Sequence, residues 1–326
     1  MVASCRLAGL AAALVMVGSP AWPQAWPNRP VTMVVPFAAG GAVDLMGRIL
    51  SPALSQLLGQ QVVVENIGGA GGMTGAARVA KAPPDGYQFV LGNAGTHAVN
   101  QTLYKQPLYN AATDFAPAAM VAETYWVLIV RKDLPATTFP EFIAYAKANQ
   151  AKMQFGSAGA GSSTHMAATI LNMAMGVSVT HVPYRGIGLA MQDLMAGRID
   201  FTCEPISTAV PQIRGNTVKA IAILGPRRTQ LLPGLPTAAE YGYPELAISG
   251  WNALFLPKGT PEAIVLRLSR AAIESVETPS VVERIEGIGY NVPPPDRRTP
   301  EFLAKFVPAE IEKWGKVIKA GGISAD

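Results

Sequence analysis

The residues best placed to do chemistry lie in two glycine-rich segments, each of which connects an apolar run to a helical pattern. The first segment follows residues 31–35 and consists of Phe37, Ala38, Ala39, Gly40 and Gly41, with Asp44 in the next turn. The second consists of Ser157, Gly159, Gly161, Ser162 and Ser163, with His165 just beyond. The first N–H groups of a helix lack backbone partners, and the helix dipole favours negative charge there. Each segment therefore predicts a binding site for an anion.

Two such segments that face each other would hold a carboxylate from both sides. The second segment adds serine hydroxyl donors, and Ser162 or Ser163 is a suitable N-cap. Asp44 has two interpretations: it could favour the helix dipole, or accept a hydrogen bond from a loop N–H or a ligand-bridging water. Arg185, in a turn after residues 180–183, could bind a carboxylate through both guanidinium edges or remain a solvated turn residue.

Other motifs fit catalytic or metal chemistry poorly. Residues 68–72, a third glycine cluster, lack the spacing of a dinucleotide or phosphate loop, which favours a surface turn. The chain has no G-x-S-x-G motif, and His165 follows Ser163 too closely to align as its base, so we expect a capping or interface histidine and no catalytic residue. His97, His165 and His181 have no metal-ligand spacing, so neither a metal site nor a cofactor is expected.

The N-terminus predicts export. Residues 1–25 contain Arg6, an apolar stretch over residues 7–17 and then small residues, which is typical of a secretory signal, with cleavage after Ala21 or Ala25. The apolar stretch is shorter than the roughly 20 residues that a membrane span requires. We therefore expect a soluble exported protein.

Composition indicates a globular protein with a large core. The chain is 49% hydrophobic and 15% charged, which excludes compositional disorder. Without the signal the net charge falls from +4 to +3, and no Lys/Arg run suggests a nucleic acid partner. Cys203 is then the only cysteine, so no internal disulfide is possible, and its apolar context predicts a buried, inert thiol.

Apolar strand patterns alternate with helical patterns, which predicts an α/β fold with mainly parallel sheets. Strands are expected at residues 31–35, 62–65, 89–92, 127–131, 180–183, 219–224 and 254–256, and helices at 74–81, 139–149, 163–175, 189–196, 261–278 and 300–318. Residues 113–123 and the Pro/Gly-rich residues 225–250 are expected to cross between two lobes with a cleft between them. Pro52 lies inside the helical pattern of residues 45–58 and predicts a kink or break near Leu50.

Several further motifs occur in a recognisable order with the two glycine-rich segments. They include Asp-Gly-Tyr at residues 85–87, His-Val-Pro-Tyr-Arg-Gly at 181–186, Ala-Gly-Arg-Ile-Asp at 196–200 and Leu-Pro-Thr-Ala-Ala-Glu at 235–240. In this order they resemble the Bug family, the periplasmic substrate-binding proteins of tripartite tricarboxylate transporters. The resemblance covers nearly all of the chain after the signal. It implies a type II periplasmic binding protein fold with lobe 1 at residues 26–122 and 241–300, lobe 2 at 123–240 and a C-terminal helix at 301–326 that packs on the lobes.

The resemblance also implies a ligand and a site. A small carboxylate or dicarboxylate would bind between the lobes, with residues 37–44 on one carboxyl group and residues 157–163 over the other end. Glu204 stands where the family usually has an aspartate, and Ala42 and Val43 stand where it often has Ser or Thr. These departures predict a less polar or aromatic carboxylate, or a ligand with a positive group.

The function implied is a solute receptor that delivers a carboxylate to the membrane subunits of a tripartite transporter. Two alternatives are a carboxylate sensor for a two-component system and an α/β hydrolase. Neighbouring genes for transporter membrane subunits would distinguish transport from sensing, and turnover of esters would indicate the hydrolase.

Overall fold

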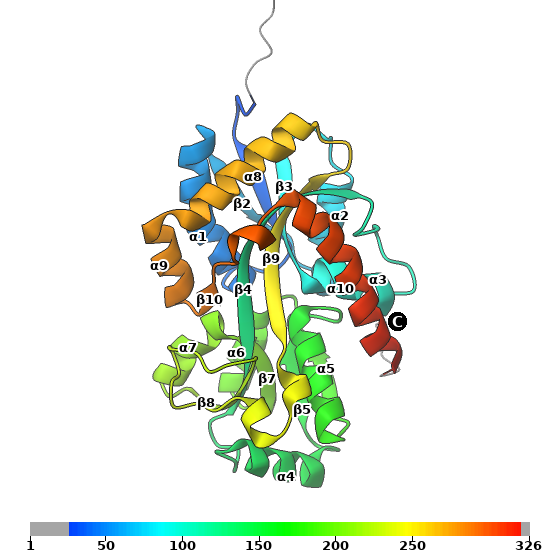
Figure 1. Ribbon diagram of the computed structural model, residues 1–326. Coiled ribbons are helices and arrows are strands. Elements are labelled where there is room, and N and C mark those ends of the chain that lie inside the picture. The colour runs from blue at the N-terminus through cyan, green and yellow to red at the C-terminus, as the bar shows by residue number, and fades with distance from the viewer. Residues whose placement is uncertain (1–25, 321–326) are drawn as a thin grey trace, which may run out of the picture.

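The computed structural model describes residues 26–320, and these form two lobes joined by two long strands, β4 and β9 (Figure 1). The predicted signal at residues 1–25 and its cleavage sites lie outside the described residues. In the described part of the chain, no helix is both long and apolar enough to cross a membrane.

Lobe 1 is built on parallel strands in the order β2-β1-β3, which continue into antiparallel β9, β4 and β10. Helices α1, α8 and α9 pack together, with α2, α3 and α10 elsewhere on the lobe (Figure 1). The bounds are β1 Val31–Val35, α1 Ala42–Leu58, β2 Val62–Asn66, α2 Met73–Ala80, β3 Gln88–Asn93, α3 Asn100–Leu103, β9 Ser249–Pro257, α8 Glu262–Glu277, α9 Pro279–Gly287, β10 Tyr290–Asn291 and α10 Pro300–Ala320.

Lobe 2 has a similar arrangement of parallel strands followed by antiparallel ones. Strands β6, β5 and β7 are parallel, and β7 and β8 run antiparallel to β4. The parallel pairs are joined through helices, as short strand–helix units require. The bounds are α4 Phe139–Asn149, β5 Gln154–Ser157, α5 Ser163–Met175, β6 Thr180–Pro183, α6 Ile187–Met195, β7 Phe201–Pro205, α7 Ile206–Arg214 and β8 Val218–Leu224.

Strand β4, Phe115–Arg131, belongs to both lobes. Residues 115–125 pair with β9, and residues 126–131 pair with β7 and β8. The crossing between lobes predicted at residues 113–123 is therefore a strand from Phe115 onward, of which only residues 127–131 were predicted as a strand. Residues 118–122 are all fully buried and mostly alanine, so they show neither the alternation nor the β-branched content that marks a strand.

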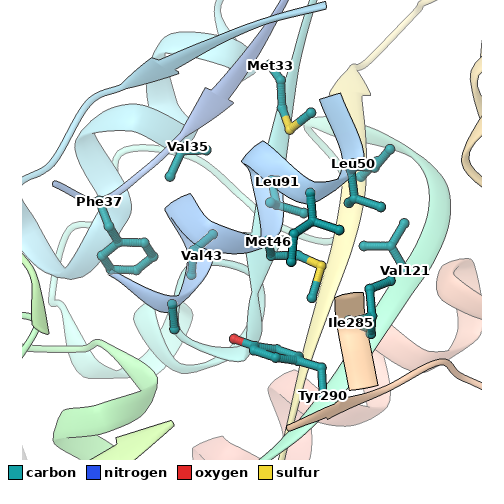
Figure 2. Close-up of a cluster of buried hydrophobic side chains, with 14 of the residues drawn as sticks. Met33, Val35, Phe37, Val43, Met46, Leu50, Leu91, Val121, Ile285 and Tyr290 are labelled. Carbon is teal, nitrogen blue, oxygen red and sulfur yellow. The ribbon is translucent and has the colours of Figure 1, made fainter. Parts of the chain in front are cut away.

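Pro52 does not break α1, which runs as one helix from Ala42 to Leu58 with Pro52 inside it. Met46, Leu50 and Leu54 on this helix are completely buried against the sheet. Proline in a helix costs about 3 kcal/mol, which burial of several large side chains offsets. Figure 2 shows that this core extends from Met33 and Leu50 down to Phe37, Val43 and Tyr290.

The chain returns from lobe 2 to lobe 1 later than predicted, because lobe 1 was expected to resume at residue 241. Leu246 and Ile248 pack in one buried cluster with Phe139 of α4, so the chain is still on lobe 2 until β9 begins. Helix α10 closes the structure, with Leu303 and Val307 in the core of lobe 1 and Trp314 and Ile318 packed beside Leu103.

Candidate functional site

A cavity with about 510 Å³ of empty space, part of it open to solvent, lies between the two lobes. Loops of both lobes and the strands that join them contribute to its wall. It is lined by Phe37, Gly41, Ala42, Val43, Asn93, Thr124, Trp126, Ala158, Ser162, Ser163, Thr164, Ile187, Pro205, Gly250, Trp251, Asn252 and Tyr290. None of these lining residues carries a charged side chain.

Helices α1 and α5 both begin at this cavity. Gly41 is the N-cap of α1 and provides no side-chain cap, so the N–H groups of Ala42 and Val43 have no capping acceptor. Ser162 is the N-cap of α5, where its Oγ accepts a hydrogen bond from the N–H of His165 at 3.2 Å. Because the unpartnered donors and the positive dipole ends of two helices converge, the cavity can bind an anion without a cationic side chain.

The predicted site residues divide into those that line the cavity and those that support it. Phe37, Gly41, Ser162 and Ser163 line the cavity. Ala38, Ala39 and Gly40 instead line a separate groove, together with residues of α6 and α7. These three residues therefore also face lobe 2, but they do not line the cavity.

Asp44 does not reach the cavity, and it braces the first loop from behind. Its carboxylate accepts hydrogen bonds from Gly40 N at 2.9 Å, Arg48 Nε at 3.0 Å and Asn66 Nδ2 at 3.0 Å. Asn66 Nδ2 also donates to the carbonyl of Phe37 at 3.1 Å. Burial disfavours the charged form of Asp44, but the hydrogen bonds from Arg48, Gly40 and Asn66 outweigh it and lower the carboxyl pKa. Of the two interpretations of Asp44, the structure supports the bond to a loop N–H.

The second loop, residues 157–163, is supported by a pair of stacked histidines, and neither histidine lines the cavity. The rings of His165 and His181 lie 4.0 Å apart, and Ser157 Oγ lies 2.7 Å from His181 Nε2. Gly161 N donates to His165 Nδ1 at 3.2 Å, and Gly159 N donates to Ser157 Oγ at 3.1 Å. Burial lowers the pKa of His165 to about 4 and that of His181 to about 3, so both rings are neutral at pH 7. Ser157, Gly159, Gly161 and His165 therefore do not line the cavity, contrary to the prediction.

Glu204, also expected at the site, does not line the cavity. It is fully buried on β7, and it accepts hydrogen bonds from Thr208 Oγ1 at 2.6 Å and Thr202 Oγ1 at 3.4 Å. Successive residues of a strand point to opposite faces, so Pro205 lines the cavity and Glu204 points away from it. Burial raises the pKa of Glu204 to about 8, and the Thr208 and Thr202 hydroxyls only partly offset this.

Two further predictions concern Arg185 and Cys203. Arg185 is exposed and does not line the cavity, which favours its interpretation as a solvated turn residue. Cys203 is fully buried, and burial raises the pKa of its thiol, so the predicted inert cysteine is confirmed. In residues 26–320, no group of three His, Cys, Asp or Glu side chains could hold a metal ion.

The wall formed by the joining strands was not predicted. Thr124 and Trp126 of β4, Trp251 and Asn252 of β9, Asn93 at the end of β3 and Tyr290 of β10 all line the cavity. The only local signal was the presence of polar residues within otherwise apolar strands. Nothing in the sequence indicates that β4 and β9 lie side by side there.

Residues 68–72 are a contact between the lobes and not a surface turn. A Cβ atom added to Gly71 would lie 2.1 Å from the carbonyl oxygen of Ala160 in lobe 2. Beside this contact, Tyr104 Oη donates to the same carbonyl at 2.7 Å, and Gly95 N donates to Ser163 Oγ at 3.0 Å. The structure is therefore a closed form in which glycine permits the two backbones to meet.

Comparison with known proteins identifies close relatives along the whole chain. Residues 46–323 match the family described as tripartite tricarboxylate transporter family receptor. A UPF0065 protein of Agrobacterium vitis is 40% identical over 297 residues, which cover 91% of this chain and 86% of that protein.

Two solved structures share the fold. The periplasmic binding protein BugD is 37% identical with a TM-score of 0.88, covering 92% of this chain and 99% of its own. MatC of Rhodopseudomonas palustris, solved with bound malate, is 38% identical with a TM-score of 0.87, covering 90% of this chain and 100% of its own. The expected periplasmic binding protein fold is confirmed.

Proposed function

The chain belongs to the tripartite tricarboxylate transporter receptor family, which includes the Bug periplasmic binding proteins, and we propose that it captures a small carboxylate in the periplasm. In this proposal residues 1–25 direct export, and the loaded receptor delivers its ligand to the membrane subunits of a tripartite transporter. MatC, a relative of similar size and fold, was solved with malate, which supports a carboxylate as the ligand.

The observation that carries the proposal is the convergence of the α1 and α5 N-termini on one uncharged cavity. Ala42 and Val43 from lobe 1 and Ser163 and Thr164 from lobe 2, the first residues of these two helices, line the same space. A carboxylate there would accept hydrogen bonds from both lobes at once. It would therefore favour the closed form over an open one in which only one helix end reaches it.

The cavity wall also supports binding without turnover. Its lining residues include no histidine, cysteine, acid or base. Ser163, the serine weighed above as a partner of His165, has its Oγ bonded to Gly95 N, and His165 Nδ1 accepts from Gly161 N. A hydrolase would need a base within hydrogen-bond reach of its nucleophile.

The test is a binding screen of the mature protein against small carboxylates, each compared with its neutral methyl ester. Native mass spectrometry of freshly purified protein would first identify any acid that co-purifies. We expect at least one carboxylate to bind in isothermal titration calorimetry and its ester to bind at least tenfold more weakly. Equal binding of acid and ester would contradict the proposal, and conversion of the ester to acid would indicate an enzyme.

Delivery to a transporter is tested separately in cells. Uptake of the identified carboxylate should require both this receptor and the neighbouring membrane subunits. Uptake that is unchanged without the receptor would contradict a role in transport.

A further inference from the structure

Trp126, a cavity-lining residue on the joining strands, carries an unused hydrogen-bond donor. Trp126 on β4 is 2% exposed, and its indole Nε1–H has no hydrogen-bond partner among the described residues. The ring is held in place by β9, because a Cβ atom added to Gly250 would lie 2.6 Å from its Cη2 atom. A buried donor without an acceptor is unfavourable, so a native site normally supplies one.

The neighbouring groups on this wall are polar and uncharged. Asn252 is almost fully buried, and its side-chain amide forms no hydrogen bond with any residue in the described range. Thr124 Oγ1 donates its proton to the carbonyl of Tyr125 at 3.2 Å, which leaves only its acceptor capacity. Glu123, the nearest acid along β4, forms an ion pair with Arg297 at 2.7 Å and does not line the cavity.

This wall suits an uncharged oxygen better than a second charge. No cation stands there to compensate the desolvation of a carboxylate, and no acid stands there to pair with an ammonium group. A hydroxyl group could accept from the indole N–H and also bond to the Asn252 amide, which both donates and accepts.

We propose that Trp126 is a ligand-binding residue. The bound carboxylate carries an uncharged oxygen, a hydroxyl in the simplest case, which accepts a hydrogen bond from the indole N–H of Trp126. This inference rests on the proposed function, because the carboxyl group of the same ligand would occupy the helix starts. It adds a specificity element on the joining strands, a side-chain donor in addition to the backbone donors of the two loops.

The experiment compares carboxylates with their hydroxylated counterparts: succinate with malate, and benzoate with 4-hydroxybenzoate. We expect one hydroxylated member to bind the wild-type protein at least about tenfold more tightly than its partner, the factor for one well-made hydrogen bond. Trp126→Phe should abolish that preference and leave the affinity for the unhydroxylated member within about twofold.

Trp251→Phe is the matched control. Trp251 also lines the cavity, but its Nε1 already donates to Glu310 Oε2 at 3.1 Å, and Glu310 keeps Trp314 as a second donor. Removing this indole should therefore preserve the preference for the hydroxylated ligand.

The outcomes separate the two proposals. Binding of carboxylates without any preference for a hydroxylated member, or a preference that survives in Trp126→Phe, overturns the inference and leaves the proposed function intact. Failure of every carboxylate to bind overturns both. If Trp126→Phe does not fold, the indole N–H resonance of Trp126 in the wild-type protein, assigned through its contacts with Gly250, should shift with the hydroxylated ligand only.

Discussion

Substitution of Gly71 by alanine should prevent the lobes from closing while leaving each lobe folded. The added Cβ would lie 2.1 Å from Ala160 O and 3.0 Å from both Gly161 C and Ser162 N, all backbone atoms of the opposite lobe. An ordinary contact needs at least 3.4 Å, so the lobes must separate at this point. Backbone atoms cannot move aside as the end of a flexible side chain can.

The expected loss of affinity follows from the bonds that this separation breaks. The hydrogen bonds from Tyr104 to Ala160 and from Gly95 to Ser163 cross the same contact. At roughly 0.5–1.5 kcal/mol each, their loss weakens the closed form by about 1–3 kcal/mol. Ligand binding requires the closed form in our proposal, so the Kd should rise by about 5- to 150-fold.

Gly59→Ala is the control for backbone strain. Gly59 and Gly71 both have positive φ, 76° and 61°, so alanine costs each a similar amount, roughly 1–2 kcal/mol. No atom lies within 4 Å of a Cβ at Gly59, so only Gly71→Ala meets a clash.

The assays are calorimetric titration with the carboxylate found in the screen and small-angle X-ray scattering at saturating ligand. Gly59→Ala should lose stability but bind and contract normally. Gly71→Ala should bind weakly and keep a larger radius of gyration. Binding by Gly71→Ala within twofold of Gly59→Ala would refute the role of this contact in closure.

Three further predictions concern the groups that brace the site. Asp44→Ala should weaken ligand binding by roughly 1–3 kcal/mol in calorimetry, because the Gly40 N–H and the Asn66 amide lose a buried acceptor. Arg48→Ala should have little effect on binding, since the Arg48 side chain is half exposed. Glu204 has a pKa of about 8 when folded and 4.5 ordinarily, so the wild type should lose up to roughly 1.4 kcal/mol of unfolding free energy per pH unit as pH rises from 4.5 to 8. Urea unfolding at pH 5 and pH 8.5 should show that Glu204→Gln lacks this loss, and parallel profiles would contradict the assignment. For His181 the unfolding free energy changes with pH in the opposite direction, because folding lowers its pKa from 6.5 to about 3. Acidification below pH 6.5 should therefore destabilise the wild type more than His181→Gln in the same measurement.

The parts of the site that depend on local chain geometry could be predicted from the sequence. Glycines and serines before a helical pattern determine where a helix begins, so the starts of α1 and α5 and the cap at Ser162 follow from short-range rules. Helix α4 and helix α5 were predicted with the bounds that the structure has.

The parts that depend on long-range contacts could not be predicted in this way. Trp126 and Asn252 lie more than a hundred residues apart in sequence and meet the same cavity only because β4 and β9 run side by side. Glu204 was expected at the site because of the position it occupies in the family pattern, whereas on β7 it is the adjacent Pro205 that lines the cavity. Gly71 looks like any turn glycine until the opposite lobe is in place.

The continuity of β4 through both lobes has a consequence for how the protein unfolds. The lobes share one ten-stranded sheet, and removal of lobe 2 would leave residues 126–131 of β4 without the β7 and β8 hydrogen bonds on either side. Despite its two-lobed shape, the chain should therefore melt as one cooperative unit, with a calorimetric enthalpy equal to the van't Hoff enthalpy. Neither lobe should be stable as a separate fragment, and hybrids that exchange lobes between relatives must exchange a compatible half of β4 as well.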